Sequence, residues 1–430
     1  MPLQMYVSGI YRKLAFTKCG RYICRLVVCN YITNHMKQSI NNFSKVLCAL
    51  MVCVGLVFSG CTEGPLGGGD NTEHDGNDDA EEMIVPVVPL GYANLSETST
   101  ANCYIVSQSG SYCLLVAKGN QNDDLLHRTK SAAVLWEAFP SSTSEVGDLI
   151  KSVLYKDGYI VFQTADIFKK GNALIAAKDA YGTVLWSWHV WFTDQPEGQE
   201  YYHNAGTMMD RDLGATENSC GGLLYQWGRK DPFLCYKSTQ VQPTIGVYNH
   251  TINSEPNTGT IEYSISNPTV FITKNSYNSD WFYTGSSLTD NTRWTESSNE
   301  KSIYDPCPAG WRVPDGGSNG VWATSLGSSS ELALTNYGSS ENGINFSGIF
   351  GSSDVINYPE WCMLDSDDGG VLDYEYAWNN YWSATNGCSF NWSVSWGISD
   401  DYYPILYPSI YPSISDIDRA AGLSIRCIQE

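Results

Sequence analysis

Residues 305–314 read Asp305-Pro306-Cys307-Pro308-Ala309-Gly310-Trp311-Arg312-Val313-Pro314, the most specific stretch in the chain. A second specific stretch comes earlier: Met208-Met209-Asp210-Arg211-Asp212-Leu213-Gly214-Ala215, then Leu224-Tyr225-Gln226-Trp227-Gly228-Arg229-Lys230-Asp231-Pro232-Phe233. A third comes later: Tyr381-Trp382-Ser383-Ala384, closed by Gly422-Leu423-Ser424-Ile425-Arg426-Cys427. The surrounding chain is rich in Ser, Asn, Gly, Tyr and Trp and has few helical patterns. This predicts a domain with long irregular loops.

Together the three stretches resemble the Fibrobacter succinogenes major paralogous domain family, which is common in lipoproteins of Bacteroidota. The resemblance covers residues 196–430. It implies a C-type-lectin-like fold, in which a compact mixed sheet and a pair of helices support long loops and the chain ends meet in one sheet. It also implies a disulfide between Cys307 and Cys427, which the cysteine spacing alone leaves open. A fold does not identify a ligand, so the resemblance leaves the function open.

The overall composition restricts both the class of protein and its partners. The chain has 430 residues, of which 42% are hydrophobic, 13% aromatic and 17% charged, and its formal net charge is -21. This is enough apolar material for one or two packed domains and too much for a disordered protein. A generic nucleic-acid binder needs basic side chains to replace counterions on the phosphates, so the charge excludes that class. Anionic membrane surfaces are poor partners for the same reason.

The first 60 residues have the features of an export signal. Seven basic and no acidic residues precede Cys61, and the apolar run 46–58 is too short to span a bilayer. The run ends in Phe58-Ser59-Gly60-Cys61, which resembles the lipobox of bacterial lipoproteins, whose cysteine is diacylated. We expect residues 1–60 to be the signal, with Met36 as the true start, Cys61 to carry the lipid and 61–88 to be a flexible acidic tether. An uncleaved anchor helix is the alternative.

Residues 89–195 alternate short β-branched and aromatic runs with turn signals. Two of these runs flank Asp157-Gly158, a two-residue loop typical of a type I′ hairpin. Several short strands at this spacing predict a small β-sandwich, with Trp186, Trp188 and Trp191 in its core or at a domain interface. The expected fold class is therefore α+β and all-β, with an N-terminal β-sandwich at 89–195 followed by a C-type-lectin-like domain at 196–430.

The sequence offers little for catalysis. Gly316-Gly317-Ser318-Asn319-Gly320 matches the G-x-S-x-G elbow of serine hydrolases, but the required histidine would follow it, and the last histidine is His250. The chain contains no H-E-x-x-H, P-loop or G-x-G-x-x-G motif. We therefore expect no enzyme and no cofactor. A glycan-processing enzyme with a carboxylate pair is the alternative, and a structural or pilus-tip-like adhesin subunit is another.

Two oxygen-rich groups are candidates for binding calcium. Glu255-Pro256-Asn257 matches the E-P-N triplet of sugar-binding C-type lectins, but it lies well before the final loops where that motif belongs. A second group resembles an EF-hand whose spacing is broken at Gly369; it comprises Asp365, Asp367, Asp368 and Asp373. We expect solvated loops and no metal site.

The last third of the chain carries the strongest indication of function. No Lys, Arg or His lies between Arg312 and Arg419, while tryptophans and tyrosines gather there among Ser, Gly and Asn. Rigid aromatic side chains in this background are typical of binding surfaces, because they bury a large area at a small entropic cost. We expect Trp382, which lies inside a family motif, to belong to the core instead.

Residues 397–418 obey a further restriction. Each can be encoded by a codon ending in a pyrimidine, and Lys, Glu, Gln, Met and Trp are absent. Randomised adenines in an Asn codon generate this set, so the segment resembles the variable region of proteins diversified by retroelements, which lies on a C-type-lectin-like fold. Ordinary Asn- and Ser-rich family loops are the alternative. The expected ligand-binding residues are Trp378, Asn391, Trp392, Trp396, Asp400, Tyr402, Tyr403, Ile405, Tyr407, Ile410 and Tyr411.

The sequence thus predicts a lipid-anchored protein of the bacterial outer membrane or cell surface. Its expected partner is a protein or glycan outside the cell. We expect it to contact the membrane only through its lipid and to bind no nucleic acid.

Overall fold

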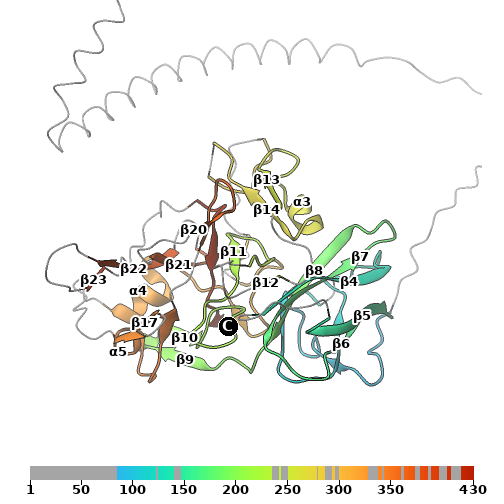
Figure 1. Ribbon diagram of the computed structural model, residues 1–430, viewed down its shortest axis with the longest axis horizontal. Coiled ribbons are helices and arrows are strands. Elements are labelled where there is room, and N and C mark those ends of the chain that lie inside the picture. The colour runs from blue at the N-terminus through green and yellow to red at the C-terminus, as the bar shows by residue number, and fades with distance from the viewer. Residues whose placement is uncertain are drawn as a thin grey trace, which may run out of the picture. The chain divides into compact units, whose positions relative to one another are not determined.

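The computed structural model describes the chain from Val85 to Glu430, with gaps (Figure 1). The described residues are 85–122, 124–139, 147–234, 242–243, 250–277, 279–285, 293–295, 300–327, 338–340, 343–359, 363–372, 378–385, 389–396, 404–407 and 418–430. All of them belong to one compact unit, Asp79–Glu430. The expected signal, Cys61 and most of the tether lie outside the described residues.

The described part of the chain is rich in β-strands and has few helices, as the sequence predicts. Its helical segments are η1 (Tyr202–Asn204), α3 (Ile261–Ser266), η2 (Gly317–Asn319), α4 (Val321–Leu326) and α5 (Ser347–Phe350). The helix α3 begins after Thr260, whose hydroxyl accepts the Tyr263 N–H at 3.1 Å and so caps the first turn. Within the described residues, every helix is too short to cross a membrane.

Two sheets occupy most of the chain before residue 195. The first has the order β1-β3-β6-β5, with bounds Ala93–Asn94, Ser111–Leu115, Tyr159–Thr164 and Ile150–Lys156. The second has the order β12-β4-β7-β8-β2, with bounds Gln242–Pro243, Ser131–Phe139, Gly171–Lys178, Val184–Phe192 and Cys103–Val106. β2 pairs with β8 in parallel, whereas β4, β7 and β8 form antiparallel pairs.

The predicted hairpin joins β5 to β6. Asp157 and Gly158 both have positive φ, 49° and 84°, as a type I′ turn requires. A Cβ at Gly158 would lie 2.9 Å from Pro86, so the incoming chain also depends on this glycine. The prediction of a hairpin turn at these two residues is confirmed.

The two sheets share one hydrophobic core. It contains Leu114 and Phe162 from the first sheet and Ile175, Trp186 and Trp188 from the second, each at most 1% exposed. A buried Ile, Leu or Phe side chain contributes roughly 1.5–3 kcal/mol relative to an exposed one. The packing of these faces therefore holds the two sheets together, and the expectation that Trp186 and Trp188 are core residues is confirmed.

A neutral histidine in β8 makes the stability of the protein depend on pH. His189 is 1% exposed, its Nε2 lies 2.8 Å from Asn172 Oδ1, and burial lowers its pKa to about 3. The unfolded chain protonates this histidine near pH 6.5 and the folded chain does not, so stability is lost as the pH falls from 6.5 towards 3. Between pH 7.5 and pH 4 we expect His189 to cost about 3 kcal/mol of unfolding free energy.

The control is His189→Gln, which keeps an N–H donor for Asn172 and cannot titrate. Urea unfolding at several pH values should show that His189→Gln loses about 3 kcal/mol less than the wild type over this range. Parallel pH profiles for the two proteins would contradict this prediction.

Four further sheets follow residue 195. One has the order β15-β25-β10-β9, with bounds Trp311–Arg312, Ile428–Gln429, Gly206–Met209 and Gly198–Tyr201. The seven-stranded sheet runs β20-β19-β24-β21-β22-β23, with bounds Val371–Leu372, Met363–Leu364, Gly422–Ser424, Trp378–Trp382, Ser389–Trp396 and Pro404–Tyr407, and β11 (Leu224–Gln226) pairs with β24. The two small sheets are β13-β14 (His250–Asn253, Val270–Thr273) and β16-β17-β18 (Gly338–Ser340, Gly343–Asn345, Asn357–Pro359).

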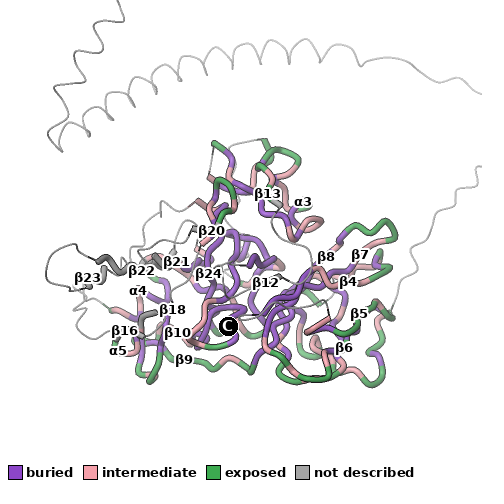
Figure 2. The backbone as a smooth tube through the Cα atoms, in the orientation of Figure 1, coloured by how far each residue is buried: buried purple, intermediate pink, exposed green. Residues whose placement is uncertain are grey.

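A second hydrophobic core contains residues from both sides of residue 195. Trp136 and Trp191 from the five-stranded sheet belong to the same cluster as Trp227 and Trp382, each at most 1% exposed. The indole of Trp191 also donates to the Ala215 carbonyl at 3.0 Å. Figure 2 shows β8 and β24 almost wholly in the buried colour. Trp191 is thus buried in the core that crosses residue 195. A domain boundary near 195, and with it an interface role for Trp191, stays a prediction.

Candidate functional site

The predicted ligand-binding residues that the structure describes lie at one end of the seven-stranded sheet. Its last strands, β21, β22 and β23, form two consecutive antiparallel pairs. β23 begins at Pro404 and ends before Pro408, in keeping with the poor fit of proline inside a ladder. β21 contains Trp378, β22 contains Asn391, Trp392 and Trp396, and β23 contains Ile405 and Tyr407. Outside the described residues lie Asp400, Tyr402, Tyr403, Ile410 and Tyr411.

The register divides the six described positions between the two faces of the sheet. Neighbours along a strand alternate between faces, and residues paired across a ladder share a face. The face of Trp382 carries the positions of Trp378, Asn391, Ile405 and Tyr407. The face of Tyr381 carries those of Trp392 and Trp396. The six positions therefore do not share a single face of the sheet.

Trp382 fixes β21 in the core that crosses residue 195. Its side chain is 1% exposed, and its indole N–H donates to the Tyr225 carbonyl at 2.7 Å. Two residues later, the Ala384 N–H donates to the Pro314 carbonyl at 2.8 Å. Through these contacts the third specific stretch, which contains Trp382 and Ala384, bonds to the second at Tyr225 and to the first at Pro314. Trp382 is a core residue, as expected.

Tyr381 joins a buried ion pair on the opposite face. Its hydroxyl donates to Asp212 Oδ2 at 3.1 Å, and Asp212 Oδ1 accepts from Arg426 Nη2 at 2.7 Å and from Nε at 3.0 Å. The guanidinium carbon lies 3.9 Å from the centroid of the Tyr358 ring. Burial alone would lower the pKa of Arg426, but Asp212 and the tyrosine rings raise it above its usual value, so the guanidinium stays charged.

The disulfide between Cys307 and Cys427 lies in the core that also contains Trp382. This confirms the pairing implied by the resemblance. Asp305 shapes the loop that carries Cys307, because its carboxylate accepts the Cys307 N–H and the Val313 N–H, each at 2.8 Å. Burial raises the pKa of Asp305 to about 6 although Lys301 opposes it, and the carboxylate is therefore ionised at neutral pH. The bridge ties this loop to the residue next to β25.

The chain is fixed again at Asp418, after the aromatic segment. Its Oδ2 lies 2.8 Å from Lys274 Nζ and accepts from the Ser366 hydroxyl at 2.6 Å. Burial raises the pKa of Asp418, but the bonds from Lys274 and Ser366 outweigh that and lower it. The next residue, Arg419, lies over the Trp227 ring, 4.6 Å from its centroid, and 3.4 Å from Asp280 Oδ2. We call residues 386–417 the C-terminal segment; fixed residues precede and follow it.

Sequence reasoning missed the Lys274 clamp on Asp418. The two residues are 144 positions apart, and neither belongs to a recognisable motif. The codon restriction gives no signal at Asp418, because it continues unbroken through Ile428. A partner 144 positions away therefore cannot be chosen from the sequence.

Other candidate groups fall in turns on the surface. Glu255-Pro256-Asn257 forms an exposed turn after β13, and Asp365, Asp367 and Asp368 form a turn after β19; Asp373 lies outside the described residues. Among the described residues, no three His, Cys, Asp or Glu side chains are arranged to hold a metal ion.

The C-terminal segment is thus flanked on both sides by fixed residues of a frame that contains the Cys307–Cys427 disulfide. Comparisons of the chain with family models, with curated proteins and with solved structures find no match.

Proposed function

We propose that this chain is a lipid-anchored protein of the bacterial outer membrane or cell surface that binds a protein or glycan ligand outside the cell. Its ligand contacts the C-terminal segment, which is variable in sequence and rich in tyrosine. A C-type-lectin-like frame carries the segment, and an N-terminal β-sandwich joins the frame to the tether. The lipid at Cys61 attaches the protein to the membrane.

The observation that supports this proposal best is that both ends of the C-terminal segment are fixed. Trp382 and Ala384 hold the entering chain, and Asp418 and Arg419 hold the returning chain. These contacts use none of the residues between 386 and 417. Within the segment, β22 and β23 join the sheet through backbone ladders, which do not require particular side chains. Positions in the segment can therefore change with little effect on stability.

Two observations support the C-type-lectin-like frame. β10, near the start of the second half, pairs with β25, which follows Cys427, so early and late strands meet in one sheet. The disulfide joins the same late residues to the loop of Cys307. For the first half, the shared core of the two sheets supports the β-sandwich.

The proposal is tested with detergent-extracted full-length protein on an array of glycans and extracellular proteins. We expect wild-type protein to bind at least one spot, and a variant with Tyr402, Tyr403, Tyr407 and Tyr411 changed to Ser to bind it at least about tenfold more weakly, as for loss of aromatic contacts. The matched control changes Tyr181 and Tyr202, which are 94% and 40% exposed, to Ser and should bind as wild type. Unchanged binding by the fourfold variant would contradict the proposal.

The same material decides between the alternatives. A bound glycan recovered intact supports binding, whereas a cleaved product supports the glycan-processing enzyme, and assembly of the protein with itself supports an adhesin subunit. Mass spectrometry of the intact mature protein tests the anchor, and the expected mass is that of a chain that begins at a diacylated Cys61. Differences among related strains should concentrate between Asn386 and Asp418, and uniform divergence would argue against diversification.

A further inference from the structure

Two tyrosine rings stack on the surface beyond the parallel strands β13 and β14. The centroids of Tyr277 and Tyr283 are 5.6 Å apart and their planes are inclined by 15°. Tyr277 is 78% exposed and Tyr283 is half-buried. Most of Tyr277 therefore faces water, where its ring can contact a partner.

A carboxylate lies at the same end of this sheet as the rings. Because β13 and β14 are parallel, Glu255, two residues after β13, and Tyr277, four residues after β14, follow the same end of the two strands. The turn that starts at Glu255 is tied to the second ring, since the Tyr283 N–H donates to the Gly259 carbonyl at 2.8 Å. A Cβ at Gly259 would lie 2.8 Å from the Tyr283 backbone, so this close approach requires glycine.

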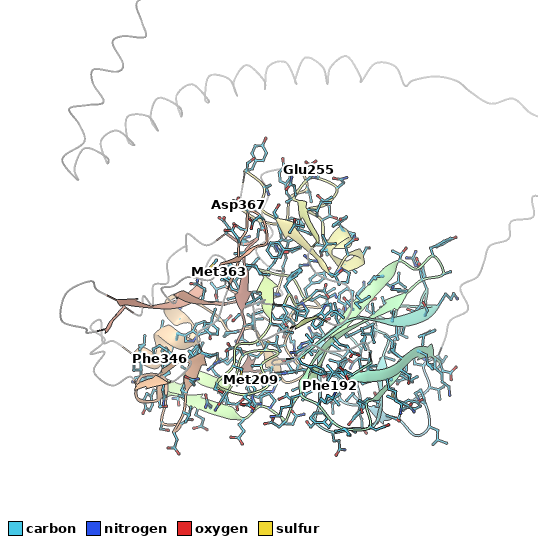
Figure 3. All side chains as sticks on the ribbon, viewed as in Figure 1. Phe192, Met209, Glu255, Phe346, Met363 and Asp367 are labelled. Atoms are coloured by element: carbon cyan, nitrogen blue, oxygen red, sulfur yellow. A yellow bond between two sulfur atoms is a disulfide. The ribbon has the colours of Figure 1, made fainter. Side chains whose placement is uncertain are left out.

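Further carboxylates lie on the side of β14. The Lys274 N–H donates to the Ser366 carbonyl at 2.8 Å, which places Asp367 and Asp368 beside the end of β14. Figure 3 shows Glu255 and Asp367 at the same end of the described unit. Lys274 already bonds to Asp367 at 3.1 Å as well as to Asp418. Within the described residues, Glu255 and Asp368 make no salt bridge, so this end of the β13–β14 sheet carries excess negative charge.

The rings are held in position before any ligand arrives. The Tyr277 N–H donates to Asn275 Oδ1 at 2.8 Å, and Asn275 Nδ2 donates to the Asp280 carbonyl at 3.0 Å. The Asp280 side chain is fully buried and lies 2.6 Å from Arg293 Nη2. A surface fixed in this way loses little conformational entropy on binding.

We propose that these residues form a binding surface for a cationic side chain, an arginine or lysine in a basic segment of a protein partner. We call it the aromatic-acidic surface; it comprises Tyr277, Tyr283, Glu255, Asp367 and Asp368. The ring face attracts a cation through its quadrupole, and the carboxylates attract it through their charge. One such contact at an exposed site is weak, so it serves as part of a larger protein interface. The surface shares no residue with the C-terminal segment and adds a second contact to the proposed function.

The test is an NMR titration of full-length protein in about 0.15 M salt, the physiological ionic strength. The probe is the peptide acetyl-Gly-Arg-Arg-Gly-amide, and its citrulline counterpart keeps the shape without the charge. We expect Tyr277→Ala to weaken binding of the arginine peptide about two- to fivefold, the effect of one exposed cation–π contact. Tyr277→Phe should bind as wild type, and the citrulline peptide should bind the wild type no better than it binds Tyr277→Ala.

The control is Tyr181→Ala, which removes a 94% exposed tyrosine from the turn between β7 and β8. All these variants keep the net charge, so unspecific attraction of the peptide is equal in each. Wild-type affinity in Tyr277→Ala, or in Tyr277→Leu, would overturn the proposal. A neutral oligosaccharide that loses affinity in Tyr277→Ala while the peptide does not would overturn the assignment of a cation. Because the C-terminal segment is unchanged throughout, failure here leaves the array result intact.

Discussion

Replacing Arg426 by methionine is expected to reduce the unfolding free energy by about 3–5 kcal/mol. The variant leaves Asp212 fully buried without its partner, and it removes the contact of the guanidinium with the Tyr358 ring. A buried carboxylate with no opposite charge is among the most costly features of a protein interior. Equilibrium unfolding in urea, followed by tryptophan fluorescence, measures the change.

Two further variants make the result specific. Lys151→Met breaks an ion pair with Asp166 whose side chains are 57% and 85% exposed, so we expect it to cost less than about 0.5 kcal/mol. The double variant Arg426→Met with Asp212→Leu removes both buried charges and should recover part of the loss. If Arg426→Met were no more costly than Lys151→Met, the ion pair would not support the frame.

Removing the disulfide by Cys307→Ser with Cys427→Ser should cost about 4 kcal/mol. The bridge closes a loop between residues 120 positions apart, and its loss restores the conformational freedom of that loop in the unfolded chain. The same loop contains the C-terminal segment. We therefore expect the double variant to lose the array signal at a temperature where the wild type retains it.

Cys220→Ser is the matched control for the disulfide. Cys220 is a free, half-buried cysteine, and its replacement should leave both stability and array binding near those of the wild type. Unfolding of the wild type with and without reductant gives an independent measurement. Equal unfolding free energies in the two conditions would contradict the expected contribution of the bridge to stability.

The features that the sequence predicted correctly are those whose cause is local. The turn at Asp157-Gly158 needs two residues that tolerate positive φ, and both are visible in the sequence. Burial of Trp186 and Trp188 follows from aromatic residues inside a strand pattern. The disulfide came from a family resemblance, because eight cysteines after Cys61 allow many pairings.

The candidate site could be predicted only in part, because its geometry depends on register and on distant contacts. A shift of one residue would exchange the faces of Trp392 and Asn391, and nothing in the local sequence sets that register. The clamp between Lys274 and Asp418 and the stack of Tyr277 on Tyr283 arise from tertiary packing. Composition indicates that aromatic residues bind something, but not which of them are presented together.

The pairing of β11 with β24 has a consequence for how the protein folds during synthesis. Leu224 lies opposite Ser424, so strands that are neighbours in the native sheet emerge from the ribosome two hundred residues apart. Until the later strand emerges, Trp227 and Leu224 lack much of their native cover and are open to aggregation or to proteases. We expect this half of the molecule to depend on chaperones until residues 422–429 have been synthesised.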